Sequence, residues 1–410
     1  MKRKGGLSPI NLLMLTVLID MTGFGMIIPL IPFYAQRFAS GAAGIGILIA
    51  SYSVMQLLFS PVLGRVSDTR GRRPVLIFSI LTSVGSFALF TFASNYFALL
   101  VSRLVAGLAT EGAVAQAYVA DITTKEERSS GIGKIGAATG IGFILGPVFG
   151  GLLSPYGLRA PGYAALFLSL VNLVLLFVLL PEPERHSVGS SESGLMESLR
   201  GVLEAVREPF IGQVYIIFFF VTLAFAAIPV IVPLLAIEYY GFTEVEMSYV
   251  FIFIGLIQVF LQGFAIKKLV SRLGEEKLII FGPLLLLLGV VLTPILRSIP
   301  GFGLSTVLVS LGVGITNTVV PGFISLMTSD DMQGSKLGVA QSVASIARIF
   351  GPLIGGFATD LGGVQIPFYV SGALLLAPFF LGCRLFQACT LNGLLGPLDR
   401  RKREDIHFQD

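Results

Sequence analysis

The stretch Gly64-Arg65-Val66-Ser67-Asp68-Thr69-Arg70-Gly71-Arg72-Arg73 lies where one long apolar run, residues 43–66, gives way to another, residues 75–95. A helix needs about 20 apolar residues to cross the hydrocarbon core of a bilayer, and both runs are long enough. The stretch between them holds four basic residues, one acidic residue and two glycines. The sequence therefore predicts two transmembrane helices joined by a tight, mainly basic loop.

Apolar runs of this kind continue in both directions along the chain. They cover residues 10–35, 43–66, 75–95, 96–122, 129–154, 159–181, 209–238, 244–270, 276–297, 300–328, 334–361 and 364–387. With 54% hydrophobic residues, 13% charged residues and a mean hydropathy of +0.86, the 410 residues hold too little polar surface for a water-soluble globule. We predict an all-α integral membrane protein with twelve transmembrane helices.

The two halves of the chain repeat each other. Gly133 and the run Gly146-Pro147-Val148-Phe149-Gly150-Gly151 recur 205 positions later as Gly338 and Gly351-Pro352-Leu353-Ile354-Gly355-Gly356. A shared offset in two separate places indicates a six-plus-six duplication, an arrangement common among secondary transporters. We therefore predict six-helix bundles over residues 1–181 and 209–388, a cytoplasmic linker over residues 182–208 and a cytoplasmic tail over residues 389–410.

The predicted linker has two parts. Residues 187–194 are rich in Ser and Gly, which favours a solvated hinge. From Leu195 to Phe210 the apolar residues follow helical spacing, which predicts an amphipathic helix against the membrane face.

The basic residues are distributed unevenly across the predicted topology. Of the 28 Lys and Arg, Arg37, Arg159 and Arg297 lie on one side and two lie within spans, while all the others lie on the side of both termini. By the positive-inside rule both termini are cytoplasmic, in a multi-pass protein of the plasma or inner membrane. A net charge of +4 spread over small clusters gives no footprint for nucleic acid.

The loop quoted first resembles the signature loop of the major facilitator superfamily. The matching residues are Gly64, an acid four residues later at Asp68, and Gly71-Arg72-Arg73, while Thr69 stands where that signature usually has Arg. The fourth span and its exit, from Arg103 through Asp121 to Arg128, resemble the second signature of the superfamily. In the fifth span a third signature, typical of its antiporters, is matched by Gly142, Gly146, Pro147, Gly150 and Gly151.

The opening helix, Leu18-Ile19-Asp20-Met21-Thr22-Gly23-Phe24-Gly25-Met26-Ile27-Ile28-Pro29, resembles that of the drug/proton antiporters, in particular the tetracycline-efflux branch. This resemblance implies two six-helix bundles, alternating access, and export of an amphipathic compound in exchange for protons. The third span has Ser83 and Ser86 but no acid, and the eighth and ninth lack the His and Asp of the tetracycline exporters. These departures argue against a metal-tetracycline substrate.

Four charged residues lie within predicted spans, where charges are costly and usually functional: Asp20, Arg103, Glu111 and Arg348. On continuous helices Asp20 and Glu111 lie at the same depth, and Arg103 lies about 12 Å from Glu111 along the axis. Because two carboxylates in a cavity of low dielectric cannot both ionise cheaply, at least one should carry a proton. We predict that this pair couples protons to the substrate charge. A purely structural ion pair that pins helices together is the alternative.

Two further groups of charged residues have predicted roles. Asp68, Arg72 and Asp121 are expected to form a cytoplasmic latch, which the second half does not repeat because Ser271 stands where the acid would be. Arg348 has no acid in its own helix nearer than Asp360, so it either pairs with an acid across the bundle interface or attracts an anionic substrate.

The function predicted from these residues is a proton-coupled antiporter that exports amphipathic compounds, including cationic ones, as a monomer in the lipid bilayer. The alternatives are an exporter of sugars or native metabolites, an anion exchanger, and, from another class, a membrane enzyme or a non-transporting receptor. An enzyme would need a catalytic constellation at a membrane face, and none is found. Cys383 and Cys389 give no zinc spacing, and His186 and His407 lie in polar segments, so we expect no metal and no cofactor.

Overall fold

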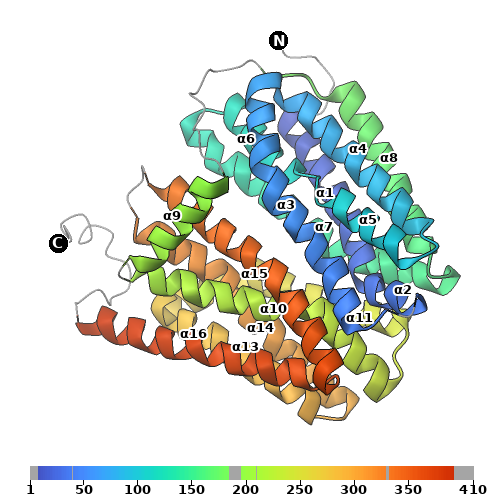
Figure 1. Cartoon of the computed structure of the whole chain (residues 1–410). Coiled ribbons are helices and arrows are strands. Elements are labelled where there is room, and N and C mark those ends of the chain that lie inside the picture. The colour runs from blue at the N-terminus through green and yellow to red at the C-terminus, as the bar shows by residue number, and fades with distance from the viewer. Residues whose placement is uncertain (1–7, 39, 184–194, 209, 329–331, 392–410) are drawn as a thin grey trace. The chain divides into compact units, whose positions relative to one another are not determined.

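The structure is a computed structural model that describes residues 8–38, 40–183, 195–208, 210–328 and 332–391, which form helices and no strand (Figure 1). In the first half the elements are α1 (Pro9–Ile27), η1 (Ile28–Leu30), α2 (Ile31–Arg37), α3 (Ala42–Arg70), α4 (Arg72–Thr91), α5 (Tyr96–Ala106), α6 (Glu111–Ile122), α7 (Lys125–Leu153), η2 (Ser154–Tyr156) and α8 (Ala160–Leu179). They are followed by α9 (Leu195–Arg207), α10 (Ile211–Tyr240), α11 (Glu244–Phe260), η3 (Leu261–Ala265), α12 (Ile266–Leu273), α13 (Glu275–Ile295), α14 (Ile299–Leu326), α15 (Gln333–Gly362) and α16 (Ile366–Leu391).

The twelve predicted spans are confirmed. Within the described ranges, twelve helical segments are long and apolar enough to cross a membrane, and each falls on one of the predicted apolar runs. Several begin at a side chain that accepts a backbone N–H of the first turn: Ser8 for α1, Asn95 for α5 and Ser298 for α14. Such N-caps satisfy donors that have no partner inside the helix, and so fix where the helix begins.

One predicted span is interrupted by non-helical residues. The fourth, residues 96–122, breaks between Ala106 at the end of α5 and Glu111 at the start of α6. Gly107 lies so close to α3 that a Cβ atom there would stand 2.6 Å from Cβ of Met55. Because of this break, Arg103 and Glu111 lie on different helices, so the continuous helix assumed for their axial separation is not found.

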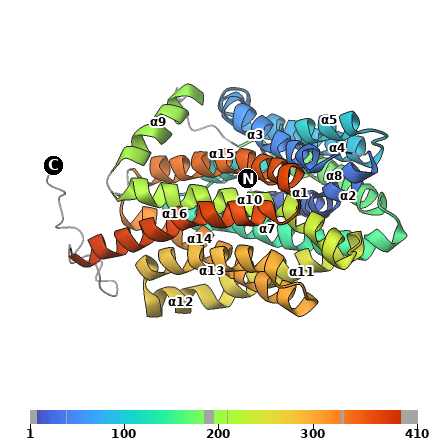
Figure 2. The same ribbon diagram turned by 60° about the horizontal axis from the view of Figure 1, so that its bottom comes forward.

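The contacts within the chain divide it into two compact units. One comprises residues 1–200, 225–256 and 345–368, and the other comprises residues 201–224, 257–344 and 369–410. In the first unit, α1 packs along α7 and α8. In the second, α13 packs along α14 (Figure 2).

A helix, α9, covers the residues for which the sequence predicts an amphipathic linker helix, while its position against the membrane face stays a prediction. Its residues Val202 and Ala205 are buried in one apolar cluster with Val214 and Tyr215 of α10. The Ser/Gly-rich residues 187–194 and residues 392–410 of the tail lie outside the described residues. The division into bundles over residues 1–181 and 209–388 stays a prediction.

Candidate functional site

A small cavity inside the first unit is lined by two buried carboxyl groups. Asp20 of α1 and Glu111 of α6 are each 4% exposed. The cavity has room for about one water molecule. The other residues around it come from α1, α3, α4 and the two sides of the break: Met21, Phe24, Tyr52, Ser83, Ser86, Phe87, Ala106 and Ala109. No Lys, Arg or His is among its described lining residues.

The two carboxyl groups face each other. The Asp20 carboxyl lies within hydrogen-bonding reach of the Ser83 hydroxyl and of the Glu111 carboxyl. Among the described residues, Asp20 Oδ1 and Glu111 Oε2 have no hydrogen-bond partner. Buried polar atoms in proteins nearly always have a partner, so these two oxygens are suited to a proton or to a ligand that enters the cavity.

The break in the fourth span determines the place of Glu111. As the first residue of α6, Glu111 stands where free N–H groups and the helix dipole favour negative charge. The break is joined to α4 by Ser79, whose hydroxyl lies 3.3 Å from both the backbone nitrogen and the hydroxyl of Thr110. Ser79, Ser83 and Ser86 follow helical spacing and are all buried, so one face of α4 presents hydroxyl groups to the break and the cavity.

Arg103, the third charged residue in this region, is stacked on aromatic rings. Its guanidinium carbon lies 5.7 Å from the ring centroids of Phe24 and Tyr52, which are themselves 4.9 Å apart. Arg103 is 2% exposed, and its Nε and Nη1 atoms have no partner among the described residues. The ion pairs found in the described part of the chain join Arg72 to Asp68 and Asp121 and Lys336 to Glu208, so Arg103 forms none with the two cavity carboxyls.

Arg348 on α15 is half-buried and donates a hydrogen bond of 3.1 Å from Nη2 to the Ser345 hydroxyl. The acid partner considered for it from the sequence is not found among the described residues.

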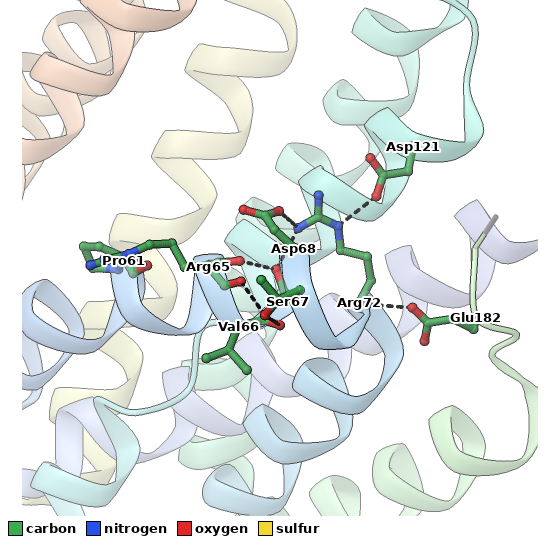
Figure 3. A network of polar contacts seen from close by, with 10 residues as sticks. Pro61, Arg65, Val66, Ser67, Asp68, Arg72, Asp121 and Glu182 are labelled. Carbon is green, nitrogen blue, oxygen red and sulfur yellow. Dashed lines mark hydrogen bonds and ion pairs between the residues drawn. The ribbon is translucent and has the colours of Figure 1, made fainter. Parts of the chain in front are cut away.

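The residues of the predicted latch lie together where α3, α4 and α6 meet (Figure 3). Arg72, the first residue of α4, donates from Nε to Asp121 Oδ2 at 2.8 Å and from Nη1 to Asp68 Oδ1 at 2.5 Å. Its Nη1 also donates to the Ser67 hydroxyl at 2.7 Å, and Ser67 in turn donates to the Gly64 carbonyl. One guanidinium therefore neutralises an acid from each of two other helices.

Glu182, which follows α8, completes this cluster and was missed by the sequence reasoning. Its carboxylate accepts the backbone N–H groups of Arg72 at 2.7 Å and Arg73 at 3.1 Å, and so caps α4 (Figure 3). Gly71 has φ +113°, and a Cβ atom on it would meet a Glu182 carboxylate oxygen at 2.5 Å. Gly71 is thus required both for its backbone conformation and for the space that Glu182 occupies. Gly64, in contrast, has open space around it.

The glycines of the fifth span lie at close helix contacts. On α7, a Cβ atom at Gly142, Gly146 or Gly150 would meet α1 at 2.6, 2.5 and 3.2 Å, respectively. Gly151 faces another helix, since its Cβ atom would lie 2.7 Å from Cβ of Ser248 on α11. Pro147 lies inside α7 next to Gly146. This seam of small residues lets α7 pack backbone to backbone against α1.

Comparison with known proteins gives consistent matches over most of the chain. The sequence model of the Major Facilitator Superfamily matches residues 13–303 and 214–405. Over 349 residues the chain is 32% identical to the tetracycline resistance protein, class E, of Escherichia coli, covering 83% of this chain and 85% of that relative. Over 376 residues it is 29% identical to multidrug resistance protein 2 of Bacillus subtilis (strain 168), covering 89% of this chain and 92% of that relative.

A solved structure matches as well. The crystal structure of the human organic anion transporter MFSD10 (TETRAN) has a TM-score of 0.68 and 25% identity, over 91% of this chain and 98% of that one. Together these similarities confirm the resemblance that the motifs of the first half predicted.

Proposed function

Because the chain belongs to the Major Facilitator Superfamily, a family of membrane transporters, we propose that it exports amphipathic, drug-like compounds in exchange for protons. The chain is a multi-pass protein of the plasma membrane that moves a small-molecule substrate, and it is not an enzyme. Relatives named for tetracycline and multidrug resistance support drug efflux. The exchange for protons is a more specific proposal, and it rests on the two acids of the cavity.

The observation that carries this proposal is the pair Asp20 and Glu111 in a cavity whose described lining holds no basic residue. Two facing carboxyl groups of low exposure cannot both be ionised at small cost, so the empty site holds at least one proton. A cation that enters the cavity stabilises the ionised form and expels that proton. Proton and cationic substrate then exclude each other, which is what an exchanger requires.

The aromatic residues of the cavity wall support an amphipathic substrate. Phe24, Tyr52 and Phe87 present ring surface next to the two acids, and aromatic faces attract organic cations as well as apolar groups. Since one water molecule nearly fills the cavity as it stands, a drug-sized compound can enter only after the surrounding helices move apart. Alternating access supplies such a motion.

In this scheme the latch of Arg72, Asp68 and Asp121 is a gate on the cytoplasmic side. It holds the ends of α3 and α6 to the start of α4 through contacts that are partly exposed, with Asp68 43% and Asp121 21% accessible. Partly exposed ion pairs contribute little net stability, so they can be broken and reformed in each transport cycle. We also propose that the protein works as a monomer in the bilayer, because one chain supplies both the carboxyl pair and the latch.

An organic anion is the second candidate substrate, and one observation favours it. Arg103 is buried with two nitrogen atoms that lack a described partner, and it could bind an anionic group above the rings of Phe24 and Tyr52. The human relative of known structure is named an organic anion transporter. In that case Arg103 and Arg348, and not the acids, would determine the charge of the substrate.

Transport by purified protein in proteoliposomes with an imposed pH gradient tests the proposal. We expect the gradient to drive accumulation of a lipophilic aromatic cation such as tetraphenylphosphonium, and Glu111→Gln to abolish it. Accumulation of carboxyfluorescein but not of the cation would favour the anion alternative. Cation transport at the same rate with and without the gradient would contradict exchange for protons.

The proposed orientation can be tested separately. Single cysteines in place of Ser94 and Ser190, in a background that lacks Cys383 and Cys389, should react with a membrane-impermeant maleimide from opposite sides. The Ser190 site should react only from the cytoplasmic side. Reaction of both from one side would contradict the topology.

A further inference from the structure

One acid outside the cavity and the latch makes an unusual contact between distant helices. The Asp360 carboxylate, near the end of α15, accepts the backbone N–H of Ala42 at 2.8 Å and that of Ala43 at 2.9 Å. These are the first two residues of α3, whose own N-cap residue, Gly41, offers no side chain. The first N–H groups of a helix lack partners within the helix and attract negative charge. Asp360 thus caps α3 from a helix about 320 positions away in the sequence.

The two backbones approach closely along this contact. A Cβ atom at Gly356 of α15 would lie 2.9 Å from Cα of Ala43. At Gly46, one turn further along α3, a Cβ atom would lie 3.1 Å from the carbonyl carbon of Pro352. Glycine at both positions is required for this contact, since any side chain would wedge α3 and α15 apart.

The internal repeat gives this contact a counterpart. Gly151 and Gly356 are equivalent by the offset of 205 positions, and Gly151 lies against α11 of the second half as Gly356 lies against α3 of the first. The glycines one position earlier also make equivalent contacts, because Gly150 faces Met26 of α1 and Gly355 faces Ile231 of α10. Both GP-x-x-GG motifs therefore contact the opening helix of their own half with one glycine and a helix of the other half with the next.

Only the second of the two repeated motifs is followed by a capping acid. The position equivalent to Asp360 is Pro155, which has no side-chain acceptor. The start of α11 is capped from within, since Glu246 accepts the backbone N–H of Thr243 at 2.9 Å. Asp360 is therefore an addition to the repeated seam and not a consequence of the duplication.

We propose that Asp360 and the first turn of α3 form an outer clasp, a gate contact that closes the extracellular end of the transport path between the two halves. The helix α3 has 29 residues, so its two ends lie about 43 Å apart, with the clasp at one end and Asp68 of the latch at the other. Asp360 is exposed, so water can replace the two N–H groups when the halves separate. The proposal of an outer clasp rests on the transport function of the family and does not depend on exchange for protons.

The accessibility of Ile45, a fully buried residue one turn into α3, reports on this gate. In full-length protein with Ile45→Cys as its single cysteine, Asp360→Asn should raise the rate of reaction with an impermeant maleimide from outside about fivefold, because Asn loses the charge and one of the two oxygens that accept the N–H groups of α3. Asp360→Glu, which keeps the carboxylate, should change the rate less. The matched control is Glu238→Gln, which removes an exposed acid near the end of α10 that takes no part in the contact.

A second variant tests the clasp with Asp360 still present. Gly41→Ser gives α3 an N-cap of its own and places a Cβ atom 2.9 Å from Asp360 Oδ2, so it should also raise the reaction rate at Ile45→Cys. An unchanged rate in both Asp360→Asn and Gly41→Ser would overturn the proposal, as would an equal increase in the Glu238→Gln control. The readout needs neither drug nor pH gradient, so failure of the proposed exchange would leave this result intact.

Discussion

The two ends of α6 carry acids in opposite situations. Near its C-terminal end, Asp121 pairs with Asp68 of α3 through the guanidinium of Arg72. At its first residue, Glu111 faces Asp20 of α1, and no basic residue lines the described cavity around them. Both arrangements join an acid of α6 to an acid of another helix. They differ in the presence of a cation and in burial.

This difference suits the two pairs of acids to two different roles. An ion pair that is partly open to water contributes only about 0–1 kcal/mol, so the latch can open in each cycle at little cost. Carboxyl groups that are buried without a cation must take up a proton or bind a positive group from outside. We infer that paired acids serve as the gate and that unpaired acids serve as the exchange site.

The largest effect is expected from removing the unpaired acids. Glu111→Gln and Asp20→Asn should each reduce gradient-driven export about 100-fold or more while the protein stays folded, because the proton then has no site that substrate can compete for. Export and thermal stability of the purified variants should be measured together. The exposed acid Glu127, changed to Gln, is the matched control. If the pair only pins helices together, the variants will instead lose stability and keep their coupling.

Removing Arg72 from the latch should leave two acids without a cation, as in the cavity. In Arg72→Gln, Asp68 and Asp121 face each other without a positive charge, and transport should fall about tenfold at neutral pH. The two acids then repel each other and no longer hold the ends of α3 and α6 to the start of α4. The exchange rate of the purified variant in proteoliposomes measures this.

Arg65→Gln is the control, since Arg65 lies on α3 near the latch and donates to the carbonyl of Pro61 and not to an acid. Exchange at the original rate in Arg72→Gln, or an equal loss in Arg65→Gln, would contradict the comparison.

A smaller loss is expected from Asp68→Asn, which keeps the pair of Arg72 with Asp121. Transport should slow about fivefold, the effect of one partly exposed ion pair, with substrate affinity within about twofold of the original. Equilibrium binding and transport rate need to be measured on the same preparation. Transport at the original rate would show that the latch is not a gate.

The smallest effect is expected at Glu182. Glu182→Gln keeps the size of the side chain but weakens the cap on α4, so the melting temperature should fall by about 2 °C and transport by about twofold. Substitution of Glu208, which pairs with Lys336 in the second unit, should leave the Asp68 latch unaffected and serves as the comparison. A loss of transport as large as that of Arg72→Gln would place Glu182 within the gate itself.

The sequence predicted the helices because their evidence is local. Each span is a mainly apolar run of the length that a bilayer requires, and a helical segment of that length is present at each in the described part of the structure. The break before Glu111 also had a local signal that was overlooked, since Gly107 followed by Thr110 and Glu111 is typical of a helix end and a new start. Residues 96–122 are mainly apolar as a whole, and this favoured the prediction of one continuous helix.

The contacts of Glu182 and Asp360 could not be found in this way. Each acid caps a helix that is 110 or more positions away in the sequence, and no spacing rule connects them. Glu182 stands in the run Pro181-Glu182-Pro183-Glu184, which reads as a polar linker. The cavity pair could be predicted from the sequence because charged residues inside apolar runs are rare. Only the structure shows that the Arg103 guanidinium stacks on aromatic rings and leaves both acids without a cation.

The most direct test of the exchange site is the release of protons when substrate binds. Purified protein in weakly buffered solution near neutral pH, with a pH indicator, should release about one proton per bound tetraphenylphosphonium, because cation and proton compete for Asp20 and Glu111. Glu111→Gln should abolish the release, whereas Asp68→Asn should leave it unchanged. Binding of the cation without release of protons, or equal release from Glu111→Gln, would contradict the account.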